Sequence, residues 1–97
     1  MELRYASNEL ERQCTDARHM QRRLGVERAK KLRLRIAELR RAVDFDDLLV
    51  MPGLWEMLSA DRSGQWSGRL TRNWRLIVRP EVDDQVAVLV VEIVDYH

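Results

Sequence analysis

The spacing of hydrophobic residues along the chain changes once, from a helical period in the first half to a strand period in the second. In the first half, apolar residues recur every three or four positions, at Leu10, Cys14, Ala17, Met20 and Leu24 and then at Ala29, Leu32, Ile36, Leu39 and Val43. This period predicts two amphipathic helices, of which the first runs from Asn8 to about Leu24. Asn8 and Glu11 have the spacing of a capping box. Gly25 is a stop signal between the helices, so they should form an antiparallel hairpin.

The second half of the chain reads as short strands separated by turns. Strands are predicted at residues 54–58, 65–70, 74–79 and 86–94, with a further short strand at 3–6 and a break at Pro80. Asp44 is expected to cap a short third helix that ends before Pro52. Short turns imply an antiparallel meander, and the last strand, apolar on both faces except at Glu92, should lie mid-sheet.

These elements predict an α+β fold, in the order β-α-α-β-β-β-β. The helical hairpin would cover one face of a twisted antiparallel sheet and leave the other face concave and partly open. Ninety-seven residues are expected to make one domain, spanning 1–97, and the composition of 45% hydrophobic and 34% charged residues is that of a globular chain.

Several classes of protein are disfavoured by what the sequence contains. The longest apolar run is far shorter than the roughly 20 residues of a membrane span, and the start of the chain does not resemble a signal peptide, so we expect a cytoplasmic protein. Cys14 stands alone at a helical core position, which favours a buried apolar role over a nucleophilic one. No residues have metal-ligand spacing and no glycine-rich phosphate loop occurs, so no metal or other cofactor is expected.

The net charge of +1 hides an asymmetry between the two halves. Residues 1–43 hold 12 Lys and Arg against 6 Asp and Glu, whereas residues 44–97 hold 5 against 10. Arg28, Lys31 and Arg35 form a basic stripe on the second predicted helix. Such a stripe is either an ordinary solvated helix face or a surface that contacts RNA phosphates without sequence preference.

The most direct sign of chemistry is the end of the chain, where Asp95, Tyr96 and His97 follow the apolar strand. A carboxylate, a phenol and an imidazole at the end of a sheet can accept a proton, stack on a base and donate a proton. A terminal carboxylate beside the His97 ring would favour its proton-donating imidazolium form. Tyr96 can equally stack on a nucleotide or close the edge of the core.

A series of motifs in order along nearly the whole chain carries a family resemblance. The motifs are Met51-Pro52-Gly53, Asp61-Arg62, Gly64-Gln65-Trp66-Ser67, Asn73-Trp74-Arg75-Leu76-Ile77 and Val94-Asp95-Tyr96-His97. This chain resembles the HigB, or plasmid-killer, branch of the RelE/ParE toxins of bacterial toxin–antitoxin modules. The resemblance implies a RelE-like fold and a ribosome-dependent endoribonuclease that cuts mRNA during translation. It also implies a helix-turn-helix antitoxin of the HigA type as partner, and no metal, because the substrate's own 2′-hydroxyl attacks the phosphate.

The resemblance also implies roles for particular residues. Arg75 should face the scissile phosphate with Arg62 in support, and Asp95, Tyr96 and His97 match the family's C-terminal site residues. The sequence departs from the family where a His and a Lys are usual, since these positions hold Glu56 and Ser59. A further family Arg falls on Thr71, and the flanking Arg69 and Arg72 are the residues that can replace it in binding RNA.

Three functional hypotheses follow from these departures. In the favoured one, Glu56 is the general base, His97 the general acid, and Arg62 and Arg75 stabilise the charge that develops on the phosphate. In the second, the site is weakened and the protein mainly binds its antitoxin. In the third, the chain is a gyrase poison like the ParE branch, against which the terminal Asp-Tyr-His argues, because a poison needs no acid–base set.

Overall fold

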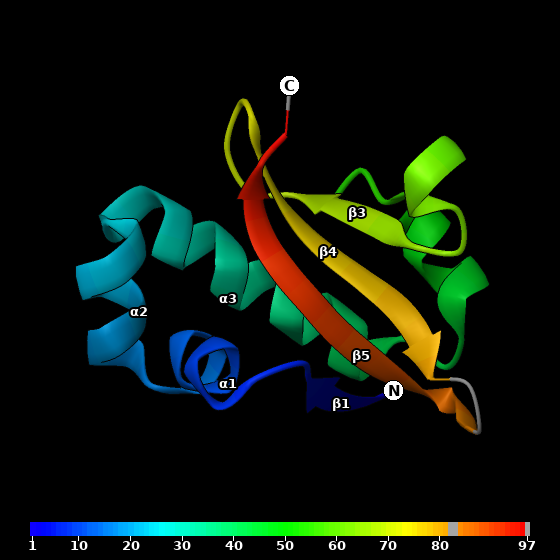
Figure 1. Cartoon of the computed structure of the whole chain (residues 1–97), viewed down its shortest axis with the longest axis horizontal. Helices are drawn as coiled ribbons and strands as arrows, with labels where there is room; N and C mark the ends of the chain where they lie inside the picture. The colour runs from blue at the N-terminus through cyan, green and yellow to red at the C-terminus, as the bar shows by residue number, and fades with distance from the viewer. Residues whose placement is uncertain (82–83, 97) are drawn as a thin grey trace.

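The computed structural model describes residues 1–81 and 84–96 and shows helices packed on a five-stranded sheet (Figure 1). The strands lie in the order β1 (Glu2–Tyr5), β5 (Asp84–Asp95), β4 (Trp74–Glu81), β3 (Trp66–Arg69) and β2 (Glu56–Met57). Strand β1 pairs parallel to β5, and the other neighbours are antiparallel. The predicted α+β class, the meander and the central position of the last strand are therefore confirmed.

Three α-helices cover one face of this sheet. They are α1 (Asn8–Thr15), α2 (Ala17–Leu24) and α3 (Val26–Arg41), and two short 3₁₀ helices, η1 (Phe45–Val50) and η2 (Ala60–Arg62), flank strand β2 in the sequence. The core forms where the apolar side of the helices meets the sheet, with Leu32 and Leu39 of α3 packed in one cluster with Leu76, Val78 and Val90. None of the helices in the described parts of the chain is both long and apolar enough to span a bilayer.

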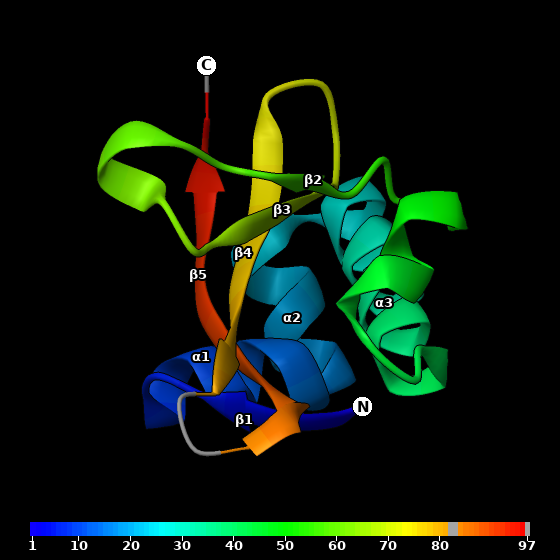
Figure 2. The same ribbon diagram turned by 90° about the vertical axis from the view of Figure 1, so that its right-hand side faces the viewer.

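The sheet is strongly twisted, so the strands at its two edges run in different directions. Figure 2 shows strands β2 and β3 running across the direction of β5. A right-handed twist that accumulates from strand to strand produces this shape. The three α-helices of the described residues lie on one face of the sheet and leave the other face without an α-helix, as predicted (Figure 1).

The first predicted helix is wrong in one respect, because it is two helices broken at Asp16. This residue is extended, with φ −100° and ψ 108°, and serves both as the C-cap of α1 and as the N-cap of α2. Its Oδ1 accepts a hydrogen bond of 3.1 Å from the backbone N–H of His19. A side chain that caps a new helix competes with continuation of the old one, and the apolar spacing across the break did not reveal it.

The predicted helix caps are half right. Asp44 caps η1 as predicted, since its Oδ1 accepts a hydrogen bond of 3.1 Å from the N–H of Asp47. The cap of α1, however, is Ser7 rather than Asn8, because the Ser7 hydroxyl accepts a hydrogen bond of 3.1 Å from the N–H of Leu10. Serine and asparagine have nearly equal N-cap preference, so the sequence alone does not separate two adjacent candidates.

All five predicted strands differ somewhat in their bounds from the observed ones, and two of the differences have a clear cause in the backbone. The strand expected at 54–58 contains only Glu56 and Met57, because Leu54 adopts a positive φ of 52° that interrupts extended backbone. The strand expected to break at Pro80 instead continues to Glu81. The pairing of β4 with β5 shifts register between Pro80 and Glu81, which is where a residue without an N–H is tolerated in a ladder.

A buried polar network joins helix α3 to the start of strand β2. The Oε1 atom of Glu38 accepts hydrogen bonds from the backbone N–H of Gly53 (3.0 Å) and from Nε1–H of Trp55 (2.8 Å). Its Oε2 pairs with Arg35, whose Nε–H donates to the carbonyl of Arg69 at 2.8 Å. A Cβ at Gly53 would lie 2.6 Å from Glu38 Oε1 and 2.5 Å from Trp55 Nε1, so the backbone comes this close only because the residue is glycine.

Replacement of Glu38 by Ala should therefore lower the free energy of unfolding by about 3–5 kcal/mol, since it leaves Arg35 buried without its carboxylate and two further donors without an acceptor. Urea unfolding measures the loss. The matched control is Glu27→Ala, on the exposed first turn of the same helix, which should cost no more than about 1 kcal/mol. Equal effects of the two substitutions would contradict the role given to Glu38.

Candidate active site

The register of the sheet brings the predicted site residues onto the face that the helices leave open. Glu56 of β2 pairs with Ser67 of β3, Ser67 with Ile77 of β4, and Ile77 with Glu92 of β5. Residues paired across a ladder point to the same side of a sheet, so this row carries Glu56 at one end and Glu92 at the other. The sequence left the orientation of Glu56 open, and the register places it on the open face.

The next row on the same face carries two arginines. Arg69 of β3 pairs directly with Arg75 of β4, and Arg75 pairs with Val94 of β5. Burial lowers the pKa of Arg75, the neighbouring charge of Arg69 lowers it further, and the carboxylate of Glu56 acts in the opposite direction. The acid and the two arginines are therefore close enough to interact, as the favoured hypothesis requires of Glu56 and Arg75.

Arg75 is held in place by the turn that joins β3 to β4. Its Nη1–H group lies 3.0 Å from the carbonyl oxygen of Thr71, and at the same distance from those of Arg72 and Trp74. Because the turn binds Nη1 through three carbonyl oxygens, it fixes the orientation of the planar guanidinium group. Arg72 itself lies exposed in the turn, and so does the side chain of Arg69 on the strand before it.

Arg62 reaches the same face from the loop that follows β2. Its Nη1–H donates to Oε1 of Gln65 at 2.9 Å, and its Nη2 pairs with the carboxylate of Glu92. Because Glu92 belongs to β5, this ion pair crosses over β4, where Ile77 is fully buried. The guanidinium carbon of Arg62 also lies 5.9 Å from the centre of the Tyr96 ring, within the range of a cation–π contact.

The end of the chain is only partly assembled into this face. The backbone N–H of Tyr96 donates to the carbonyl of Asn73 at 2.7 Å, which fixes the end of β5 beside the turn, and the side chain remains 40% exposed. Asp95 pairs with Trp74, so it lies on the opposite side of the strand from Glu92 and Val94. His97, the predicted general acid, lies outside the described residues, and its role remains a prediction.

The basic stripe on helix α3 is not a free surface, which corrects the prediction for Arg35. Arg35 is 6% exposed and bound to Glu38 and to the carbonyl of Arg69, so it cannot contact RNA in this structure. Lys31 is half-buried, and Arg28 lies with its guanidinium carbon 4.3 Å from the centre of a Trp74 ring. The stripe faces the β3–β4 hairpin, and Arg28 and Lys31 alone remain candidates for phosphate contact.

Two further residues near the helices and the sheet were not recognised from the sequence. In the sequence, Glu92 stands out only as the one charge in an apolar strand. A charge at such a position needs a partner, and in the structure that partner is Arg62. His19, which belongs to no motif in the sequence, is only 6% exposed, and its Nε2 lies 2.6 Å from Oε1 of Glu9. That contact lowers the pKa of Glu9 and lies among the helices, so His19 has no place on the open face.

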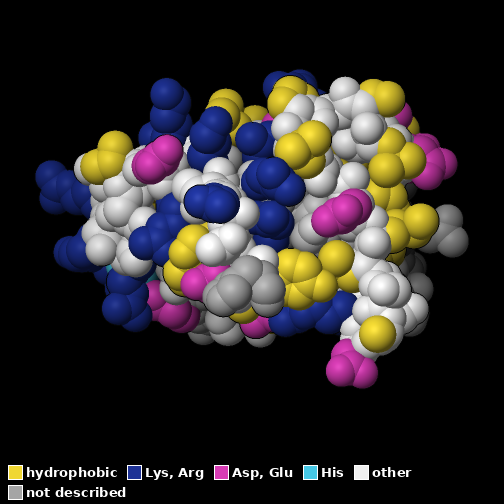
Figure 3. Space-filling view, turned by 90° about the horizontal axis from the view of Figure 1, so that it is seen from above, with side chains coloured by type: hydrophobic (Ala, Val, Ile, Leu, Met, Phe, Trp, Pro, Cys, Tyr) yellow, Lys and Arg dark blue, Asp and Glu magenta, His cyan; other side chains and the backbone are white. Residues whose placement is uncertain are grey.

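The distribution of charge at the C-terminal end of the molecule agrees with this arrangement. Seen from that end, Lys and Arg side chains gather over the helical side and the centre, whereas hydrophobic side chains predominate on the other side (Figure 3). A cluster of cations at this end of the molecule can attract a phosphate backbone.

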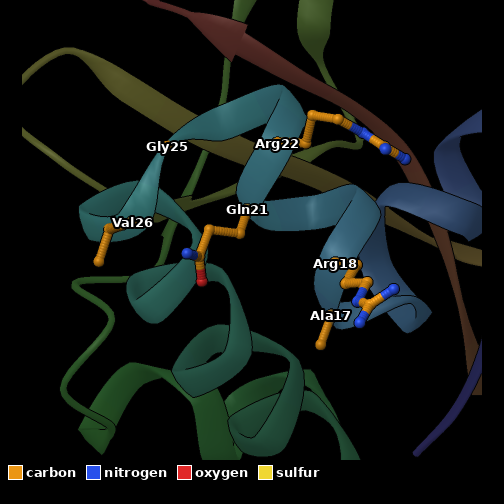
Figure 4. Close-up of a pocket in the computed structure, with 6 residues that line it drawn as sticks. All are labelled: Ala17, Arg18, Gln21, Arg22, Gly25 and Val26. Atoms are coloured by element: carbon orange, nitrogen blue, oxygen red, sulfur yellow. The ribbon is translucent and has the colours of Figure 1, made fainter.

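A groove lies away from the sheet, between α2 and α3. This open groove of about 460 Å³ is lined by Ala17, Arg18, Gln21, Arg22, Gly25 and Val26. Figure 4 shows Arg18 and Arg22 extending to the same side of α2, away from Val26. It offers cations but none of the predicted acid–base residues, so it does not replace the open face as the candidate site. Within residues 1–81 and 84–96, no three His, Cys, Asp or Glu side chains gather as they would around a metal ion.

Comparison with known proteins reveals the fold but no sequence family. The sequence matches no protein-family model, and it matches no curated protein. Among solved structures, the chain is similar to a YoeB/ParE toxin from Agrobacterium tumefaciens, with a TM-score of 0.69 at 21% identity over 100% of this chain and 99% of the other. It is also similar to chains of two YoeB–YefM structures from Staphylococcus aureus, one of them described as a heterotetrameric toxin–antitoxin complex. These have a TM-score of 0.61 at 21% identity and cover 100% of this chain and 97% of the other. The chain therefore has the fold of these toxins.

Cys14 is buried as predicted, with 5% of its surface exposed, and burial raises the pKa of its thiol to about 12. A thiol-specific reagent at pH 8 should thus react with the folded protein roughly a hundredfold or more slowly than with the urea-unfolded chain. Folding favours the protonated thiol, so its stabilising contribution is complete below the ordinary pKa of 9.0 and is lost as the pH rises toward 12. Rapid native-state reaction, equal to that of the unfolded chain, would show that Cys14 is accessible.

Proposed function

We propose that this protein is the toxin of a type II toxin–antitoxin module and that it cleaves mRNA on the ribosome. The observation that carries the proposal is the pair of arginines on the open face, with a glutamate beside them. Like charges placed directly opposite each other on neighbouring strands destabilise a sheet, and Arg69 and Arg75 are so placed. An anion between the two guanidinium groups converts this repulsion into attraction, and a phosphate suits their planar forks best.

The surroundings of the arginines favour RNA as the source of that phosphate. Tyr96 offers an exposed aromatic ring at the border of the face, on which a base can stack. Arg72 and Arg28 extend the cationic surface around the hairpin, where they can contact neighbouring phosphates.

The proposed reaction uses the 2′-hydroxyl of the RNA as the nucleophile. Glu56 accepts the hydroxyl proton, the 2′-oxygen forms a bond to phosphorus, and the bond from phosphorus to the 5′-oxygen breaks. Arg75 and Arg62 stabilise the additional negative charge on the phosphoryl oxygens in the transition state. His97 is proposed to protonate the departing 5′-oxygen. The products are a 2′,3′-cyclic phosphate and a free 5′-hydroxyl. Glu56 gains one proton and His97 loses one, while one bond to phosphorus forms and one breaks, so the proposed step requires no metal.

The proposed partners follow from the same module. The similar Staphylococcus aureus toxins were solved as YoeB–YefM complexes, which supports an antitoxin partner for this chain. Its motifs resemble the HigB branch, so we propose a HigA-like helix-turn-helix antitoxin. Action on ribosomes would place the free toxin in the cytoplasm.

The alternative of a binding protein without activity rests on a specific observation. Arg62 is paired with Glu92, and the Nη1 atom of Arg75 is occupied by turn carbonyls, so both cations already have partners within the chain. A protein that only binds its antitoxin would show this arrangement without needing to release either residue. Activity measurements separate the two proposals.

The purified protein, added to a reconstituted bacterial translation system, should cut the translated mRNA and leave 2′,3′-cyclic phosphate ends. Glu56→Gln should slow single-turnover cutting by about 10²–10⁴-fold, because the base is lost. Arg75→Lys should slow it by about 10²–10³-fold, because the charge stays but the fork is lost.

Glu27→Gln, on the exposed start of α3, is the matched control and should cut at the wild-type rate. Intact mRNA in every reaction would reject the nuclease proposal in favour of the binding protein. Inhibition of DNA supercoiling by gyrase, with mRNA intact, would instead support the ParE-like alternative.

A further inference from the structure

The ion pair between Arg62 and Glu92 suggests how the open face controls its own access to RNA. We propose that Glu92 occupies the position of an RNA phosphate on Arg62, so that RNA must displace this carboxylate in order to bind. This inference rests on the proposed function, because it takes RNA as the ligand of the face. It assigns Glu92 a regulatory role that depends on the charge of its side chain.

The contacts of Arg62 show that the carboxylate and a phosphate compete for the same donors. The guanidinium uses Nη1 for Gln65 and Nη2 for Glu92, while its carbon atom lies over the Tyr96 ring, 5.9 Å from the ring centre. A phosphate whose base stacks on Tyr96 would approach the same edge of Arg62 that Glu92 now fills. Carboxylates and phosphates are bound by guanidinium groups with the same paired geometry, so one can replace the other.

The exposure of the pair makes the exchange possible. The side chain of Arg62 is 29% exposed and that of Glu92 is 40% exposed, so water reaches both partners. Ion pairs at such positions contribute little net stability, unlike the buried pair of Arg35 and Glu38, whose side chains are 7% and 4% exposed. A multivalent anion can therefore replace Glu92, whereas it cannot replace Glu38.

The location of the ion pair explains why replacement of Glu92 by a phosphate would change the charge of the open face. Arg62 ends η2, between β2 and β3, and the carboxylate of Glu92 ties it to the central strand β5. While Glu92 is bound, the cation of Arg62 is neutralised and the open face offers Arg69 and Arg75. Once a phosphate replaces Glu92, the cation of Arg62 joins theirs on the bound RNA.

Binding of an RNA oligonucleotide with a 2′-deoxy nucleotide at its cleavage site tests the proposal without requiring cleavage. Glu92→Gln keeps the shape of the side chain and removes its charge, so it should bind roughly two- to fivefold more tightly than the wild type at low salt. Salt weakens the Arg62–Glu92 pair as well as the RNA contacts, so the difference should shrink as salt rises. The slope of log affinity against log salt should steepen by about 0.7, the value of one single-strand phosphate contact.

Two further variants separate competition from a general change of charge. Glu81→Gln removes a carboxylate that pairs with Arg4 at 3.7 Å near the other end of β4, and it should leave RNA affinity unchanged. In an Arg62→Ala background, Glu92→Gln should also have no effect, because the competed cation is gone. Thermal unfolding of each variant establishes that it is folded before binding is compared.

The outcomes distinguish this inference from the proposed function. Equal affinities of wild type and Glu92→Gln, weaker binding by Glu92→Gln, or an equal gain in the Arg62→Ala background would each overturn the competition. No RNA binding by any folded variant would overturn the proposed function together with the inference. Tighter binding by Glu92→Gln with no cutting of translated mRNA would uphold the inference and reject only the catalytic part of the proposed function.

Discussion

The carboxylate of Glu38 is the contact on which the geometry of the open face depends. It is buried and binds the backbone of Gly53, the indole of Trp55 and the guanidinium of Arg35. The first two contacts set where the chain enters strand β2, and Glu56 is the next residue along. Arg35 extends the same network to the carbonyl of Arg69, at the end of β3. One buried acid on the helical side thus positions an acid and a cation on the opposite side of the sheet.

This arrangement places one fixed cation, Arg75, near a more adaptable one, Arg62. The β3–β4 turn holds Arg75 through three carbonyl contacts, and Arg69 faces it across the ladder. Arg62, by contrast, is carried on a loop and held by a half-exposed ion pair. Arg75 and Arg69 would receive a phosphate, and Arg62, which Glu92 neutralises in the free protein, would join them after Glu92 is displaced.

Much of the fold follows from local patterns that the sequence displays. The change from a helical to an alternating period located the helices and the meander, and the apolar run before Asp95 placed the last strand inside the sheet. The break at Asp16 was not predictable in this way, because a capping side chain interrupts the backbone without disturbing the apolar spacing. Motif order identified Arg62 and Arg75 as candidates, and the register then placed Glu56 on their face.

The features that the sequence did not reveal depend on partners distant along the chain. The helical spacing placed Arg35 in a basic stripe on the helix surface, but Arg35 binds the carbonyl of Arg69, which is 34 residues away in the chain. Arg62 and Glu92 are 30 residues apart, so neither residue alone signals the pair. The burial of a charged side chain is decided by tertiary packing, and helical periodicity reports only which residues share a face.

The most direct test of the account is a crystal structure of the protein with an RNA that carries a 2′-O-methyl group at the cleavage site. We expect the scissile phosphate to lie between the guanidinium groups of Arg69 and Arg75, with Glu56 beside the blocked 2′-oxygen and a base on Tyr96. RNA bound instead along the groove between α2 and α3, with the open face unoccupied, would contradict the central claim that this face is the site of binding and cleavage.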